Sequence, residues 1–136
     1  MNNLLTAIMT KLSGSALSSD VGGRIFADEA PDGAPFPYVV FLIISDVPDN
    51  TFTDDLHEIV IQFSLYSTSS GLAEITDMYA DLKALFDDCT LAITSTTFLF
   101  MKRQSMTTMF DAITTPAGEV GVRHWAADYI IKTRTS

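Results

Sequence analysis

Two stretches of the chain carry apolar residues at the spacing of an α-helix. In each, an apolar side chain recurs every three or four positions, which gathers these side chains on one helical face. The first stretch runs from Asn3 to Ser13, and Gly14 can end it. The second runs from Gly71 to Asp87, and three hydroxyl residues can cap its start: Thr68, Ser69 and Ser70. The apolar positions are Leu4, Leu5, Ile8, Met9 and Leu12 in the first stretch, and Leu72, Ile75, Met78, Tyr79, Leu82, Leu85 and Phe86 in the second.

Four other stretches have the composition or the alternation of β-strands. Tyr38 to Ser45 is a continuous run rich in β-branched and aromatic residues, so we expect a central strand covered on both faces. Leu56 to Tyr66 alternates in polarity, which is typical of a strand with one buried face, and it should form a hairpin with the strand before it. Thr96 to Arg103 and Val120 to Thr133 also alternate and predict two later strands.

The alternation also predicts which side chains share a face. In the strand from Leu56, one face carries Ile59, Ile61, Phe63 and Leu65. In the last strand, one face carries Val122, His124, Ala126, Asp128 and Ile130, and the other carries Arg123, Trp125, Ala127, Tyr129 and Ile131. In the strand from Thr96, Phe98 and Phe100 should lie opposite Leu99 and Met101.

Three segments read as loops. Ala30 to Pro37 is rich in proline, which disfavours a helix at the preceding residue. Asp46 to Asp55 is acidic, and Gln104 to Gly118 is rich in methionine and threonine and ends in a turn. Because long loops in a compact domain are often functional, we expect the last two to project and to contact a partner. The candidate contact residues are Asp46, Asp49, Asn50, Asp54, Asp55, Gln104, Met106 and Met109.

The order of these elements predicts an α+β fold. A chain of 136 residues suits a single domain over residues 1–136 and is long enough to bury a core. We expect a single twisted, mainly antiparallel β-sheet with two α-helices packed on one side.

The net charge of −9 is unevenly distributed along the chain. Residues 1–90 hold 14 acidic and 3 basic side chains, whereas residues 91–136 hold 3 acidic and 5 basic ones. The acidic excess argues against tight DNA binding, which needs many Lys and Arg residues. It permits contacts between acidic and basic parts of neighbouring copies, for which the candidate residues are Lys102, Arg103 and Arg123.

The sequence predicts no enzyme, no cofactor and no metal site. His57 and Glu58 match half of a zinc-protease motif, but Ile61 stands where the second histidine should be. The acidic loop could hold a hard cation, although its spacing fits no calcium-loop pattern. The single cysteine, Cys89, cannot form an internal disulfide and fits synthesis in a reducing cytoplasm. The longest apolar run, Tyr38 to Ile44, is too short to span a membrane.

Several of these features occur in an order that resembles one family. They are the opening helix, Gly22-Gly23-Arg24-Ile25-Phe26, the proline-rich spacer with Pro37-Tyr38-Val39-Val40, and the strand Glu58 to Tyr66 leading into Ser69-Ser70-Gly71 and a helix. A strand that carries Arg123 and ends near Arg134 closes the domain. In this order the chain resembles the tail-terminator, or tail-completion, family of minor tail components of long-tailed bacteriophages.

The resemblance implies a non-enzymatic virion protein, made in the host cytoplasm and located at the head-proximal end of the tail. Members form a ring, commonly of six subunits, that caps the tail tube, stops its polymerisation and joins it to the head connector. DNA passes through the lumen without specific binding, and the partners are the tail tube protein and the connector or stopper protein.

Three other functions fit parts of the sequence. The first is another ring protein of the same particle, either a head-completion (stopper) protein or a tube subunit. The second, of a different class, is a small metal-dependent enzyme that uses the acidic loop. The third is an acidic DNA mimic directed at the host, which predicts a monomer or dimer and no ring.

Overall fold

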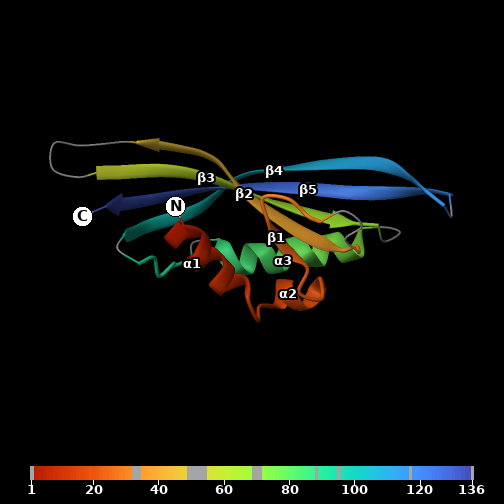
Figure 1. Ribbon diagram of the computed structural model, residues 1–136, viewed down its shortest axis with the longest axis horizontal. Helices are drawn as coiled ribbons and strands as arrows, with labels where there is room; N and C mark the ends of the chain where they lie inside the picture. The colour runs from red at the N-terminus through yellow and green to blue at the C-terminus, as the bar shows by residue number, and fades with distance from the viewer. Residues whose placement is uncertain are drawn as a thin grey trace.

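The computed structural model describes residues 2–31, 35–48, 55–68, 72–87, 89–94, 96–116 and 118–135. Within these ranges, three helices lie on one face of a five-stranded sheet (Figure 1). The helices are α1 (Asn2–Leu12), α2 (Ala16–Asp20) and α3 (Ala73–Phe86). The strands are β1 (Ile25–Ala27), β2 (Tyr38–Pro48), β3 (Asp55–Ser67), β4 (Thr97–Thr115) and β5 (Gly118–Thr135).

The sheet confirms the predicted α+β class. Its strand order is β1-β2-β3-β5-β4, and the β1–β2 pair is parallel while the other pairs are antiparallel. Two helices were expected, and α2 is a third, short one that is capped by the Ser15 side chain. Gly22 and Gly23 then form the turn into β1, both with positive φ angles.

The core lies between β3, β5 and the helices. The predicted inward face of β3 is confirmed, because Ile59, Ile61, Phe63 and Leu65 are all buried. Phe63 stacks on Phe86 of α3 at 4.7 Å between ring centroids and meets the edge of Tyr129 of β5 at 5.6 Å. Each such fully buried side chain contributes roughly 1.5–3 kcal/mol of transfer free energy, so this cluster fixes the helices to the sheet.

The two predicted helical faces are mostly buried, and the exceptions lie at their margins. The buried side chains are Leu4, Ile8 and Leu12 of α1, and Ile75, Met78, Leu82 and Phe86 of α3. Leu72 was expected to belong to the buried stripe of α3. It is instead the N-cap residue, makes no side-chain capping bond, and is 51% exposed. The predicted caps Ser69 and Ser70 lie outside the described residues.

The expectation that β2 would be covered on both faces is wrong for its second half. Val39, Val40 and Phe41 are buried, but Ile44 and Val47 are more than half exposed. The strand also continues beyond Ser45 to Pro48, with a register shift between Ile43 and Ser45. Because the helices cover only one face of the sheet, the other face of this half has no layer over it (Figure 1).

The largest correction concerns Gln104 to Gly118, which is not a loop. β4 continues through it to Thr115 and stays paired with β5 as far as the Thr115–Gly118 partners. Partner atoms on β5 satisfy the backbone here, and the threonines suit an extended chain. Pro116 follows β4 as part of the predicted turn.

Two irregularities in β4 also overturn the predicted alternation. Register shifts occur between Phe98 and Phe100 and between Arg103 and Ser105. The first shift places Phe98 and Met101 on the same, core-facing side, although they were expected on opposite faces. An extra residue in one strand reverses the facing of all that follow it, and sequence alternation cannot reveal that.

The far end of the β4–β5 hairpin extends past the helical layer (Figure 1). We call this part, residues 107–115 paired with residues 118–126, the arm. At the opposite end of the sheet, β2 and β3 also run beyond the helices (Figure 1). The chain therefore has one compact body and two strand ends that project from it.

Candidate interaction sites

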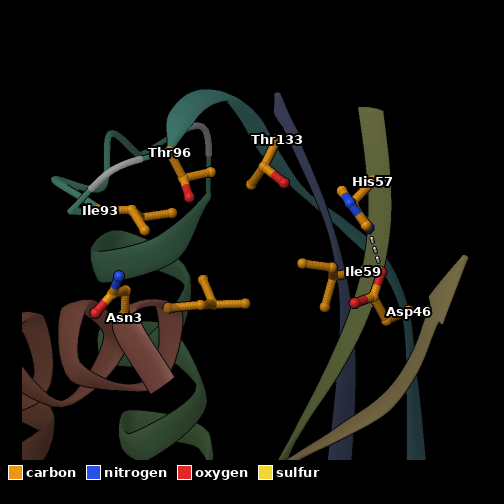
Figure 2. Close-up of a pocket in the computed structure, with 8 residues that line it drawn as sticks. Asn3, Asp46, His57, Ile59, Ile93, Thr96 and Thr133 are labelled. Carbon is orange, nitrogen blue, oxygen red and sulfur yellow. Dashed lines mark hydrogen bonds and ion pairs between the residues drawn. The ribbon is translucent and has the colours of Figure 1, made fainter. Parts of the chain in front are cut away.

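A small pocket lies at the β2–β3 end of the sheet, beneath the start of α1. Its volume is about 130 Å³, and it is lined by Asn3, Leu4, Asp46, His57, Ile59, Ile93, Thr96 and Thr133. Figure 2 shows Asp46 and His57 on the strand side of the pocket, with Asn3 and Ile93 across from them. The pocket is too small for most ligands, which usually occupy several hundred Å³.

His57 joins two of the predicted acidic residues in this region. Its Nδ1 atom lies 3.0 Å from Asp46 Oδ1, and its Nε2 atom lies 3.4 Å from Asp55 Oδ1 (Figure 2 shows the first contact). These contacts tie the end of β2 to the start of β3. The other predicted residues of the segment, Asp49, Asn50 and Asp54, lie outside the described residues.

The chemistry of this trio is limited. Across the described ranges, no set of three or more His, Cys, Asp or Glu side chains is placed to hold a metal ion. Asp46 and Asp55 approach opposite nitrogen atoms of the same imidazole ring. The histidine therefore stands between the two carboxylates, and the three side chains do not converge on one point where a metal ion could bind. The observed arrangement is a set of polar contacts that connects strands β2 and β3.

Arg103, a predicted charge for contacts between subunits, is engaged inside the chain. Its Nη1 atom donates a hydrogen bond to Tyr79 Oη at 2.6 Å, and its Nη2 atom lies 3.5 Å from Asp87 Oδ2. The hydrogen bond with Tyr79 is the main cause that raises the pKa of Arg103. These contacts connect β4 to α3.

Asp87 also accepts a hydrogen bond from the buried Tyr129 Oη at 2.6 Å. Burial is the main cause that raises the pKa of Tyr129, followed by this bond and the charge of Asp87. Lys102 differs from its neighbour Arg103, although both are exposed: its Nζ atom lies 5.8 Å from the centre of the Phe100 ring, and no described carboxylate forms an ion pair with it. Lys102 is therefore more accessible to a partner than Arg103.

The arm carries an exposed apolar groove on the side that faces the helices. The groove has a volume of about 340 Å³ and an open mouth. Phe110 is 61% exposed there, and its ring lies against Gly121, where a Cβ atom would come within 2.5 Å of Phe110 Cζ. We call this the arm groove, and its lining residues are Leu72, Thr108, Met109, Phe110, Arg123 and Trp125.

Arg123 forms the polar edge of the arm groove. Its guanidinium carbon lies 5.1 Å from the centre of the Phe110 ring, a cation–π contact. Its Nε atom is buried and has no hydrogen-bond partner among the described residues. Because buried polar groups are normally hydrogen-bonded, this atom indicates that a hydrogen-bond acceptor is missing beside Arg123.

The remaining predicted contact residues lie on β4 in three different settings. Gln104 is exposed at the second register shift. Met106 packs against the core and is partly buried. Met109 is 40% exposed, pairs with His124 and also lines the arm groove. Of these three residues, Met109 alone meets Arg123, because both line the arm groove.

The helix-free face of the sheet carries an aromatic row that the sequence pattern did not reveal. Ring centroids are 5.0 Å apart for Phe36 and Tyr38, 4.8 Å for Tyr38 and Tyr66, and 4.3 Å for Tyr66 and His124. Burial lowers the pKa of His124, which favours the neutral ring. The only signal in the sequence was that Tyr66 and His124 both fall on faces opposite the core-facing residues.

A second unpredicted feature is an acidic group on α2 and α3, formed by Asp20, Asp77 and Asp81. Burial, a hydrogen bond with Asp81, and the charges of Asp81 and Asp77 raise the pKa of Asp20 to about 6. Within the described part of the chain, no Lys or Arg forms an ion pair with any of the three. We call these residues the α2–α3 acids.

Comparisons with known proteins give one family and one fold. The family model described as "Tail completion protein gp17" matches residues 5–126. A solved structure, "Virion of native gene transfer agent (GTA) particle", contains a chain of similar fold, with a TM-score of 0.70 and 15% sequence identity. The similarity covers 95% of this chain and 92% of that one.

No curated protein matches the chain. None of the described helices is both long and apolar enough to cross a membrane.

Proposed function

The chain belongs to the tail completion protein gp17 family, and we propose that six copies of it form a ring that terminates the phage tail. It is a structural protein of a phage tail and part of the virion. In the proposed role, the ring sits at the head-proximal end of the tail. There it caps the tail tube, stops its polymerisation and presents a surface to the head connector.

The family match carries this proposal, because residues 5–126 include most of α1, all of α2 and α3, strands β1 to β4 and the whole arm, and leave out only the last part of β5 and the first residues of α1. The shape supports it: the strand ends project from both sides of a compact body, as a subunit needs in order to reach its neighbours (Figure 1). A closed ring requires two different patches on each subunit.

The charge of the chain supports a passive role toward DNA. With a net charge of −9, the subunit has too few cations to hold phosphates by counterion release. A ring of such subunits would let DNA pass without specific binding. The partners in this proposal are further copies of the chain, the tail tube protein and the connector or stopper protein, and the role is not enzymatic.

Electron microscopy of a phage lysate tests the role directly. An early stop codon in the gene should give overlong or ragged tubes that are detached from filled heads. Supplying the wild-type chain from a plasmid in the same host should restore joined particles, which controls for effects on neighbouring genes. Filled heads that leak DNA beside tails of normal length would instead assign a head-completion role. Normal infectious particles would refute both roles.

A further inference from the structure

The arm groove has the features of a binding surface that is already shaped. Phe110 is exposed, yet its ring packs on Gly121 and makes a cation–π contact with the Arg123 guanidinium. Leu72 also lines the groove and is 51% exposed. An exposed aromatic side chain that is already fixed loses little entropy on binding, which is typical of interface anchors.

The polar requirement of the groove is equally specific. Arg123 has a buried Nε atom without a hydrogen-bond partner, and no described carboxylate forms an ion pair with its guanidinium. An arginine fork next to an aromatic ring is suited to bind a carboxylate while the ring packs on apolar atoms. The groove therefore fits a partner surface that presents a carboxylate.

The chain itself offers such a surface at another place. The α2–α3 acids carry three carboxyl groups close enough for Asp81 and Asp77 to raise the pKa of Asp20, and no described cation balances them. They lie on the helical layer, whereas the arm extends past that layer (Figure 1). One surface lacks an anion and the other lacks a cation.

We infer that the arm groove of one copy receives the α2–α3 acids of the next copy, with Arg123 pairing across the interface with Asp77, which is exposed, whereas Asp81 is already hydrogen-bonded with Asp20. The contact joins two different patches, so it is heterologous, and its repetition gives a ring when the rotation from copy to copy closes on itself. This inference rests on the proposed ring and names the residues that hold neighbouring subunits together.

A charge exchange in the phage tests this contact. Five chains are supplied in turn to the phage with the stop codon: wild type, Arg123→Glu, Asp77→Arg, the double variant, and Lys11→Glu. The last makes an equal charge change on α1, outside both surfaces. The readouts are the infectious titre and the amount of the chain in purified particles.

Each single exchange should lower both readouts roughly tenfold or more, because it places like charges opposite each other at the contact. The double variant should recover most of the loss, and Lys11→Glu should match the wild type. Circular dichroism and melting temperature identify a folding defect, and Arg123→Gln, which removes the charge with less disturbance, should cause a smaller loss in the same direction.

The outcomes separate this contact from the proposed function. If the wild-type chain is in the particles but Arg123→Glu is harmless, the inference is refuted and the proposed function stands. Loss by Arg123→Glu without recovery in the double variant refutes the second copy as occupant and favours a carboxylate on a different tail protein. Absence of the wild-type chain from purified particles refutes both proposals.

Discussion

The body and the arm share strands β4 and β5, yet side chains on the same face of the sheet are buried in the body and exposed in the arm. In the body, Ala127, Tyr129 and Ile131 are buried under the helices. In the arm, Phe110 on the paired strand faces the same side of the sheet and is 61% exposed. The backbone pairing is continuous through both regions, so the difference comes from the helical layer, which covers only one of them (Figure 1).

This contrast separates two contributions to a strand. Ladder hydrogen bonds to β5 hold the arm of β4 in an extended form without a core beneath it. Burial of apolar side chains supplies most of the stability of the body. Apolar side chains in the arm add little to folding, so they are free to contact a partner.

The largest effect should come from truncating equivalent aromatic rings in the two regions. Phe63→Ala should reduce the free energy of unfolding by about 3–5 kcal/mol, because it opens a cavity against Phe86 and Tyr129. Phe110→Ala should change it by about 0.5 kcal/mol or less, as is usual at an exposed position. Urea denaturation of dilute protein measures both variants, and equal losses would remove the distinction between body and arm.

A smaller effect should come from the polar contacts that fasten the body. Tyr129→Phe removes the hydrogen bond to Asp87 and should reduce the free energy of unfolding by about 1–2 kcal/mol. Tyr38→Phe is the matched control, because Tyr38 is partly exposed on the helix-free face. The same denaturation experiment compares them, and an unchanged midpoint for Tyr129→Phe would show that this bond contributes nothing net.

The smallest effect concerns the pH dependence of the α2–α3 acids. Burial and the neighbouring acids raise the pKa of Asp20 from 3.8 to about 6, so the folded state binds more protons than the unfolded state within that window. Stability contributed by protonated Asp20 should therefore be present at the acidic end of the window and be lost as pH rises through it. Asp20→Asn should flatten this dependence and slightly raise the melting temperature at pH 7.

Melting curves between about pH 4 and pH 7 measure this effect. Glu29→Gln is the control, because it removes an exposed carboxylate outside the α2–α3 acids. A wild-type and an Asp20→Asn protein with the same pH profile would contradict the assigned cause. If the α2–α3 acids also bind Arg123 of a neighbour, the Asp20 effect should shrink in the assembled ring.

The sequence predicted well where one period of hydrophobicity ran over many residues. The alternating face of β3 and the stripe of α3 were both identified, because each places its apolar residues on a single buried surface. Prediction failed at Gln104 to Gly118, where most of β4 lies beyond the core and the segment therefore shows no alternation of hydrophobicity. It failed at Phe98 for another reason, since a register shift depends on the partner strand.

Candidate site residues were only partly accessible from the sequence. Arg123 was selected for its charge, but its setting beside Phe110 and Gly121 depends on the register of β4 against β5. Arg103 looked equivalent to Arg123 and is instead bonded to Tyr79 and Asp87. A list of charges cannot distinguish a cation that is already paired from one that is available.

By itself the sequence determined the fold class, the two main helices, the inward face of β3 and the uneven charge, because each follows from composition or local period. Only the tertiary structure decided where the helical layer ends, how β4 shifts against β5 and which charges meet. Those features depend on contacts between residues far apart in the chain, and local sequence patterns do not predict such contacts. The arm groove, made of residues from α3's cap, β4 and β5, exists only at that level.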